Sequence, residues 1–96
     1  MDGLDITHHD HGTRGEYRAH LEGHDETGLL TYVWRGDSLV ADHTIVPPEI
    51  GGRGVAAELV LRLVADARAN GWKIVPQCSY IDAMFRRHPD WADLRA

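Results

Sequence analysis

The sequence has 96 residues, a formal net charge of −5 and a hydrophobic content of 43%, which together describe one small domain with a single core. No basic cluster exceeds Arg86-Arg87, which argues against a nucleic-acid partner because phosphate contacts need a basic face. No apolar run approaches the roughly 20 residues of a membrane span, and the N-terminus lacks the pattern of a secretory signal. Cys78 is the only cysteine, so no internal disulfide can form and a reducing cytoplasm is expected.

The first half of the chain predicts an antiparallel meander. Residues 1–13 are polar and are expected to form a ragged N-terminus, with at most a short strand over 4–8. The next segments alternate apolar with polar residues or are rich in β-branched and aromatic side chains, as half-buried strands are. Three strands are therefore expected, over residues 15–22, 29–35 and 38–46.

The second half changes to a helical period. Pro47-Pro48 ends the third strand, because proline cannot donate to a ladder. We expect a helix over 54–70, a strand over 72–78 and a second helix over 80–87. Gly71 can take the left-handed conformation that ends a helix, and Ser79 is the predicted cap of the second helix, with Asp82 as its capping-box partner.

These elements run in the order β-β-β-α-β-α. A strand–helix–strand unit packed on a meander predicts an α/β (α+β) domain over residues 14–96, with a mixed, mostly antiparallel sheet and helices packed on it.

The glycine-rich segment Gly51-Gly52-Arg53-Gly54-Val55-Ala56 lies between a predicted strand end and a helix start. Free backbone N–H groups and the positive end of a helix dipole form an anion site there, and Arg53 can add charge-assisted bonds. The alternative is a plain left-handed turn that only starts the helix.

A second motif overlaps this segment, because Gly52-x-Gly54-x-x-Ala57 matches the dinucleotide fingerprint. That fold needs an acidic residue at the end of the following strand, about 20 residues further on. The predicted strand over 72–78 contains no carboxylate, and 96 residues cannot hold a doubly wound sheet. We therefore reject the dinucleotide interpretation.

Four stretches together carry a family resemblance. They are HTIVPPE at 43–49, GRGVA at 52–56, VPQCSY at 75–80 and RHP at 87–89. The chain resembles the small, single-domain branch of the GNAT superfamily, the YjdJ-like group of GCN5-related N-acetyltransferases. The resemblance covers about half of the chain, from Asp42 to Trp91, and the meander before it agrees in pattern only.

This resemblance implies an acetyl-CoA site and no metal. In the superfamily the strand before the loop splays from the next strand, and pantetheine lies in the gap. The residues that the resemblance places at the coenzyme are Ile45, Val46, Gly51, Gly52, Arg53, Gly54, Val55 and Ala56. Gly51 stands where the superfamily has Gln or Arg, which removes a side chain but no backbone donor.

Three residues are candidates for catalysis. Many relatives place a proton-donating tyrosine in the last helix, where this chain has Phe85, so Tyr80 at the start of that helix is the substitute. Cys78, at a strand end before a helix N-terminus, is either a nucleophilic thiolate or a small buried hydrophobe. His43 shares its strand face with apolar residues and is either a general base or a hydrogen-bonded core residue.

The run His8-His9-Asp10-His11 lacks a known metal-ligand spacing and is interpreted as a solvated loop. The helices and strands that wall the acceptor site in larger relatives are not expected, so this site is open or is completed by a homodimer or a protein partner. Three hypotheses follow: an N-acetyltransferase acting on a small-molecule or peptide amine, a non-catalytic acyl-CoA-binding or sensing module, and a scaffold whose loop is only structural.

Overall fold

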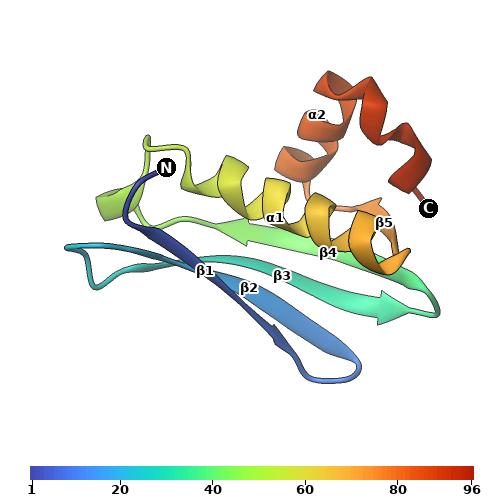
Figure 1. Ribbon diagram of the computed structural model, residues 1–96, viewed down its shortest axis with the longest axis horizontal. Coiled ribbons are helices and arrows are strands. Elements are labelled where there is room, and N and C mark those ends of the chain that lie inside the picture. Colours follow the sequence, from blue (N-terminus) through green and yellow to red (C-terminus); the bar gives the residue numbers. More distant parts are fainter.

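The computed structural model describes residues 1–96, and its sheet has five strands in the order β1-β2-β3-β4-β5. The strands are β1 (Leu4–Asp10), β2 (Arg14–Leu21), β3 (Thr27–Arg35), β4 (Ser38–Ile45) and β5 (Lys73–Pro76). The first four form an antiparallel meander, whereas β5 lies parallel to β4. The sheet confirms the predicted fold class and adds one strand to the predicted order (Figure 1).

The helices lie on one face of this sheet and leave its other face uncovered (Figure 1). They are the 3-10 turn η1 (Pro48–Ile50), α1 (Val55–Asn70), α2 (Ser79–Arg87) and the 3-10 segment η2 (Pro89–Leu94). One hydrophobic core joins the covered face of the sheet to all four of these elements. No helix combines the length and the apolar character that spanning a bilayer requires.

The alternation of β2 determines which face is covered. Tyr17, Ala19 and Leu21 are buried, and the residues between them point to the uncovered face. Gly28 on β3 lets α1 approach closely, since a Cβ there would lie 3.0 Å from Cγ1 of Val55. The first turn of α1 is therefore fixed against the sheet, next to the glycine-rich loop.

The expectation of a ragged N-terminus over residues 1–13 is wrong, because β1 occupies most of that segment and pairs with β2 along its whole length. Most of its side chains are polar, whereas Leu4 and Ile6 pack against the hydrophobic core. The His8 ring stacks on Tyr17 with centroids 4.4 Å apart and planes within 8°, and Arg62 of α1 donates to the Ile6 carbonyl at 3.1 Å. Composition alone does not reveal this strand, because the residues that anchor it belong to β2 and α1.

The ends of the helices follow one prediction and depart from another. Gly71 ends α1 in the left-handed conformation at φ 72°, as predicted. The predicted cap at Ser79 is wrong, because Ser79 is already helical and Cys78 is the N-cap residue. The Asp82 carboxylate does not close a capping box; it pairs with Arg86 one turn later at 2.7 Å.

Candidate functional site

The pairing between strands β4 and β5 ends halfway along β4. Their parallel pairing ends at Ala41 and Pro76, and the Ala41 carbonyl then accepts the N–H groups of both Gln77 (3.1 Å) and Cys78 (3.0 Å). From Asp42 onward β4 is paired with β3 on one side only. The last part of β4 is thus a free edge inside a sheet that is otherwise continuous.

The chain runs from this edge through η1 into the glycine-rich loop and α1. Gly54 is the N-cap of α1 with φ 86°, and no side chain caps the helix. The first helical bond is from Glu58 N–H to the Gly54 carbonyl, so the N–H groups of Val55, Ala56 and Ala57 have no partner within the helix. These donors lie at the positive end of the α1 dipole, which is the arrangement that binds phosphate.

The loop before Gly54 contributes less than expected at one position. The Gly51 N–H donates to the Pro48 carbonyl at 3.1 Å, which corrects the expectation of a free donor there. Gly52 has φ 70°, and a Cβ there would meet nothing within 4 Å. Arg53 is exposed and makes no ion pair, so its guanidinium is available to an anion.

The two apolar candidates at the end of β4 face different surroundings. Ile45 is 54% exposed and pairs across the strands with Leu29 on the uncovered face of the sheet. Val46 packs against the hydrophobic core. Only Val46 therefore belongs to the covered side, where α1 begins.

Cys78 is half-buried, and its thiol points toward Thr44, with 3.7 Å between Sγ and Oγ1. Burial raises the pKa of the Cys78 thiol, but hydrogen bonding to nearby groups lowers it by more, and the net shift is downward. The groups that lower this pKa are the backbone N–H of Ile81, the side chain and backbone of Thr44, and the backbone N–H of Tyr80. The Cys78 side chain makes no capping hydrogen bond to α2. The sulfur thus lies where a helix N-terminus stabilises a thiolate.

Thr44 was not among the sequence candidates. Its side chain reaches Cys78 because Thr44 pairs with Leu30 on the covered face of the sheet. No motif marks this residue, since the contact joins positions 34 residues apart.

Tyr80 and Phe85 lie on α2 in different surroundings. Tyr80 is 37% exposed in the first turn of α2, two residues after Cys78. Phe85 is buried against Trp91, with ring centroids 5.3 Å apart. Phe85 is thus a core residue, whereas Tyr80 is the exposed tyrosine on this helix.

His43 does not share a face with Leu39 and Ala41, contrary to expectation, whereas Ile45 does lie on its side of the strand. Tyr32 pairs with Ala41, whereas Thr31 pairs with His43, so Asp42 is an extra residue in β4 and forms a β-bulge. The Thr31 hydroxyl donates to the Asp42 carboxylate at 2.6 Å across this bulge. The His43 side chain is therefore exposed on the uncovered face, on the other side of β4 from Cys78.

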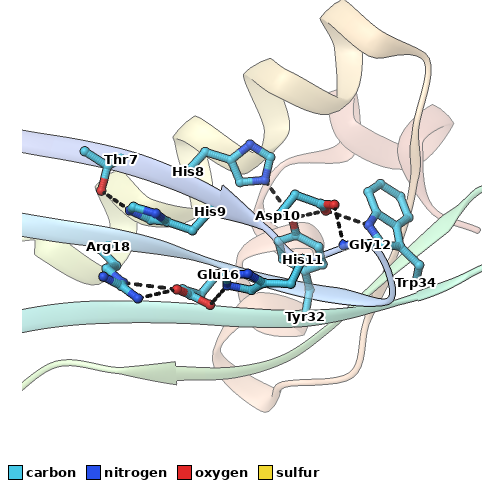
Figure 2. Close-up of polar contacts among 10 residues, drawn as sticks. All are labelled: Thr7, His8, His9, Asp10, His11, Gly12, Glu16, Arg18, Tyr32 and Trp34. Carbon is cyan, nitrogen blue, oxygen red and sulfur yellow. Dashed lines mark hydrogen bonds and ion pairs between the residues drawn. The ribbon is translucent and has the colours of Figure 1, made fainter.

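His8, His9 and Asp10 of the histidine-rich segment lie in β1 and not in a solvated loop, and the exposed His11 follows the strand (Figure 2). The Asp10 carboxylate accepts hydrogen bonds from the Tyr32 hydroxyl (2.7 Å), the Trp34 indole (2.7 Å) and the Gly12 N–H (2.9 Å). These bonds, that of Tyr32 above all, lower the pKa of Asp10 to about 2. His8 Nε2 lies 2.6 Å from the same Tyr32 hydroxyl.

No three His, Cys, Asp or Glu side chains converge in an arrangement that would hold a metal ion. The surface has four hollows, and none of them includes Cys78 or the glycine-rich loop. A ligand on the free edge of β4 would therefore lie along an open surface.

Both the sequence and the fold resemble those of known proteins. The sequence model of the GCN5-related N-acetyl-transferase family matches residues 16–94. The chain is similar to a solution NMR structure of a GCN5-like protein from Staphylococcus aureus, itself assigned only provisionally as an N-acetyltransferase. That similarity has 26% identity and a TM-score of 0.72, and covers 100% of this chain and 91% of the other. No curated protein matches the chain.

Proposed function

The chain belongs to the GCN5-related N-acetyltransferase family, and we propose that it is an acetyl-CoA-dependent N-acetyltransferase acting on an amine. The observation that carries the proposal is the free edge of β4. This edge leads through a glycine-rich loop into a helix whose first N–H groups have no partner. A cytoplasmic location remains our expectation.

The residues present fit the pyrophosphate of coenzyme A. The N–H groups of Val55, Ala56 and Ala57 can donate to phosphate oxygens, and Gly52 and Gly54 put no Cβ in the way. Arg53 can add a charge-assisted bond from the exposed side of the loop. The pantetheine arm would then follow the edge of β4 from Val46 toward Thr44.

The bound thioester supplies an activated acetyl group. In direct transfer, the neutral amine nitrogen attacks the carbonyl carbon, the new C–N bond forms and the C–S bond breaks. The departing thiolate takes a proton from the Tyr80 hydroxyl, and His43 accepts the proton that the amine loses. The two groups lie on opposite sides of β4, so proton donor and proton acceptor would approach the carbonyl from different faces.

A covalent route is the alternative mechanism. The Cys78 thiolate attacks the same carbonyl carbon, an S-acetyl bond forms on Cys78, and the coenzyme thiolate leaves and is protonated. The amine then attacks the acetyl-cysteine, the C–N bond forms, the C–S bond to Cys78 breaks and the Cys78 thiolate is regenerated, while His43 accepts the proton that the amine loses. The lowered pKa of Cys78 supports this route, and the superfamily's habit of direct attack supports the other.

The uncovered face of the sheet is the acceptor side in this proposal. A hollow of about 440 Å³ on β2 and β3 is lined in part by Thr31, the cross-strand partner of His43, and by Glu16, which Arg18 holds at 2.7 Å. This hollow is shallow and open, so a homodimer or a protein partner would complete its wall. A small-molecule or peptide amine suits such a surface, whereas neither nucleic acid nor a membrane is expected.

A non-catalytic acyl-CoA-binding or sensing module is the second candidate. It is favoured by one observation, the buried Phe85 in place of the tyrosine that many relatives use. Both candidates require the same coenzyme site, and they differ only in turnover.

The central test is ligand-dependent stability. Acetyl-CoA and free coenzyme A should both raise the melting temperature, because each binds only the native state through its pyrophosphate. At a hundredfold excess over Kd the gain is about 2.7 kcal/mol, which is on the order of 10 °C for a domain of this size. No shift in a sample that melts cooperatively would leave only the scaffold hypothesis, and a tight complex with NAD would restore the dinucleotide interpretation.

The mechanism is tested by intact-protein mass spectrometry after mixing with acetyl-CoA. The covalent route requires a gain of one acetyl group that is lost in Cys78→Ser and discharged by an amine acceptor. Direct transfer requires no adduct and normal turnover by Cys78→Ala, with Tyr80→Phe and His43→Gln as the impaired variants. Coenzyme binding without thiol release, over a panel of amines and peptides, would identify the binding module.

A further inference from the structure

A second hollow lies at the opposite end of β4 and α1 from the proposed coenzyme site. It has a volume of about 480 Å³ and is formed where the β1–β2 hairpin, the β3–β4 hairpin and the turn after α1 meet. Seven residues line it: Gly12, Trp34, Gly36, Asp37, Asn70, Gly71 and Trp72. It shares no residue with the free edge or the glycine-rich loop.

Two walls of this hollow are aromatic and meet at a right angle. The indole rings of Trp34 and Trp72 are half-buried, with centroids 5.2 Å apart and an interplanar angle of 83°. The Trp34 ring is held in place, because its Nε1 donates to the Asp10 carboxylate and Asp10 also accepts from Gly12 (Figure 2). The walls are therefore built before any ligand arrives.

The electrostatics of the hollow are negative. Asp37 is the only charged residue among the seven that line it, and no hydrogen bond or ion pair engages its carboxylate. Asn70 and Gly71 end α1, so the negative pole of the helix dipole lies at the same place. A free carboxylate, a helix C-terminus and two indole rings at one hollow favour one kind of ligand, a cation.

We propose that this hollow binds an organic cation of the alkylated ammonium class. Tryptophan rings attract cations more strongly than other aromatic rings do, and alkyl groups on the nitrogen can contact the indoles that line the hollow. A bare metal ion would find one carboxylate only, and an anion would meet Asp37 and the end of the α1 dipole. The site is separate from the acyl-CoA edge and does not depend on acetyl transfer.

Choline and its neutral tert-butyl analogue test the proposal in two-dimensional NMR spectra of the full chain. Choline shifts the indole N–H resonances of Trp34 and Trp72, whereas Trp91, packed on Phe85 and His88, is the internal control. The neutral analogue has the same shape and binds at least about threefold more weakly, because the cation–π contribution is lost. A peptide carrying one trimethyllysine forms the second arm, and binding tighter than that of choline identifies a protein-borne source of the cation.

Asp37→Asn and Asp25→Asn form a matched pair, since both remove an exposed carboxylate from a turn. Asp37→Asn weakens choline binding by about threefold to fivefold, the range of an exposed charge pair, and Asp25→Asn leaves the affinity unchanged. The proposal is overturned if choline leaves both indole resonances in place at millimolar concentration. It is also overturned if the neutral analogue binds equally well, or if both variants weaken choline alike.

Discussion

The two ends of the sheet differ in whether their hydrogen-bonding groups have partners. At the hairpin end, Asp10 accepts three hydrogen bonds and ties β1 to β3 through Tyr32 and Trp34. At the loop end, β4 runs on without a partner after Ala41, and α1 begins without a cap at Gly54. The difference lies in the backbone donors at the start of α1, which have no partner, whereas no buried side-chain polar atom of the protein lacks one.

The largest effect is expected when a Cβ is placed at the loop end. Gly54→Val should abolish coenzyme A binding, with a loss of at least about tenfold in affinity, because a branched residue resists φ 86° and obstructs the phosphate donors. The protein should remain folded, at a cost of about 1–2 kcal/mol for the left-handed conformation. Isothermal titration calorimetry with coenzyme A measures the affinity, and chemical denaturation measures the stability.

Gly12→Val is the matched control at the hairpin end. Gly12 has φ 93°, and a Cβ there would meet nothing within 4 Å, so the backbone strain is comparable. This variant should lose similar stability and keep its coenzyme affinity. Equal losses of affinity in the two variants would mean that strain, and not the phosphate site, explains the effect at Gly54.

The converse change removes the charge of Asp10 at the hairpin end, where the carboxylate has its hydrogen-bond partners. Asp10→Asn should lower the free energy of unfolding by about 1 kcal/mol, because it weakens the hydrogen bonds from Tyr32 and Trp34. The loss is not larger because solvent exposure already weakens these bonds in the wild type. Coenzyme affinity should be unchanged, since the loop end is not involved. Urea denaturation and calorimetry on the same samples provide both values.

The same variant carries a pH signature. The pKa of Asp10 is about 2 in the folded protein against an ordinary 3.8, so its contribution is complete above pH 3.8 and is lost as pH falls toward 2. The stability difference between wild type and Asp10→Asn should therefore shrink across that interval. A difference that stays constant down to pH 2 would contradict the hydrogen-bonded carboxylate.

The smallest effect is expected at Cys78. The pKa of the thiol is lower in the folded protein than in free cysteine, so the pH profile of alkylation by iodoacetamide should lie at lower pH than in the denatured chain. Thr44→Val should move the profile partway back, because one of several stabilising groups is lost. Coinciding profiles for folded and denatured protein would remove the thiolate argument for the covalent route.

Much of the fold could be predicted because its signals are local. The alternation of Tyr17, Ala19 and Leu21 indicated β2, and Gly71 marked the end of α1. For β1 at most a short strand over 4–8 was predicted, because most of its residues are polar and part of its anchoring comes from Tyr17 on β2 and Arg62 on α1. Local patterns cannot show a strand whose anchoring partners lie elsewhere in the chain.

The sequence by itself determined the glycine-rich loop at the start of α1, because glycine at Gly54 has the same conformational freedom in any context. It also determined the mixed sheet, since side-chain period is a property of each segment. Only the tertiary structure decided the face on which His43 lies, because the bulge at Asp42 arises from pairing with β3. The same holds for the contact of Thr44 with Cys78 and for the bonds from Tyr32 and Trp34 to Asp10. Each of these contacts joins residues that come close to one another only when the sheet has formed.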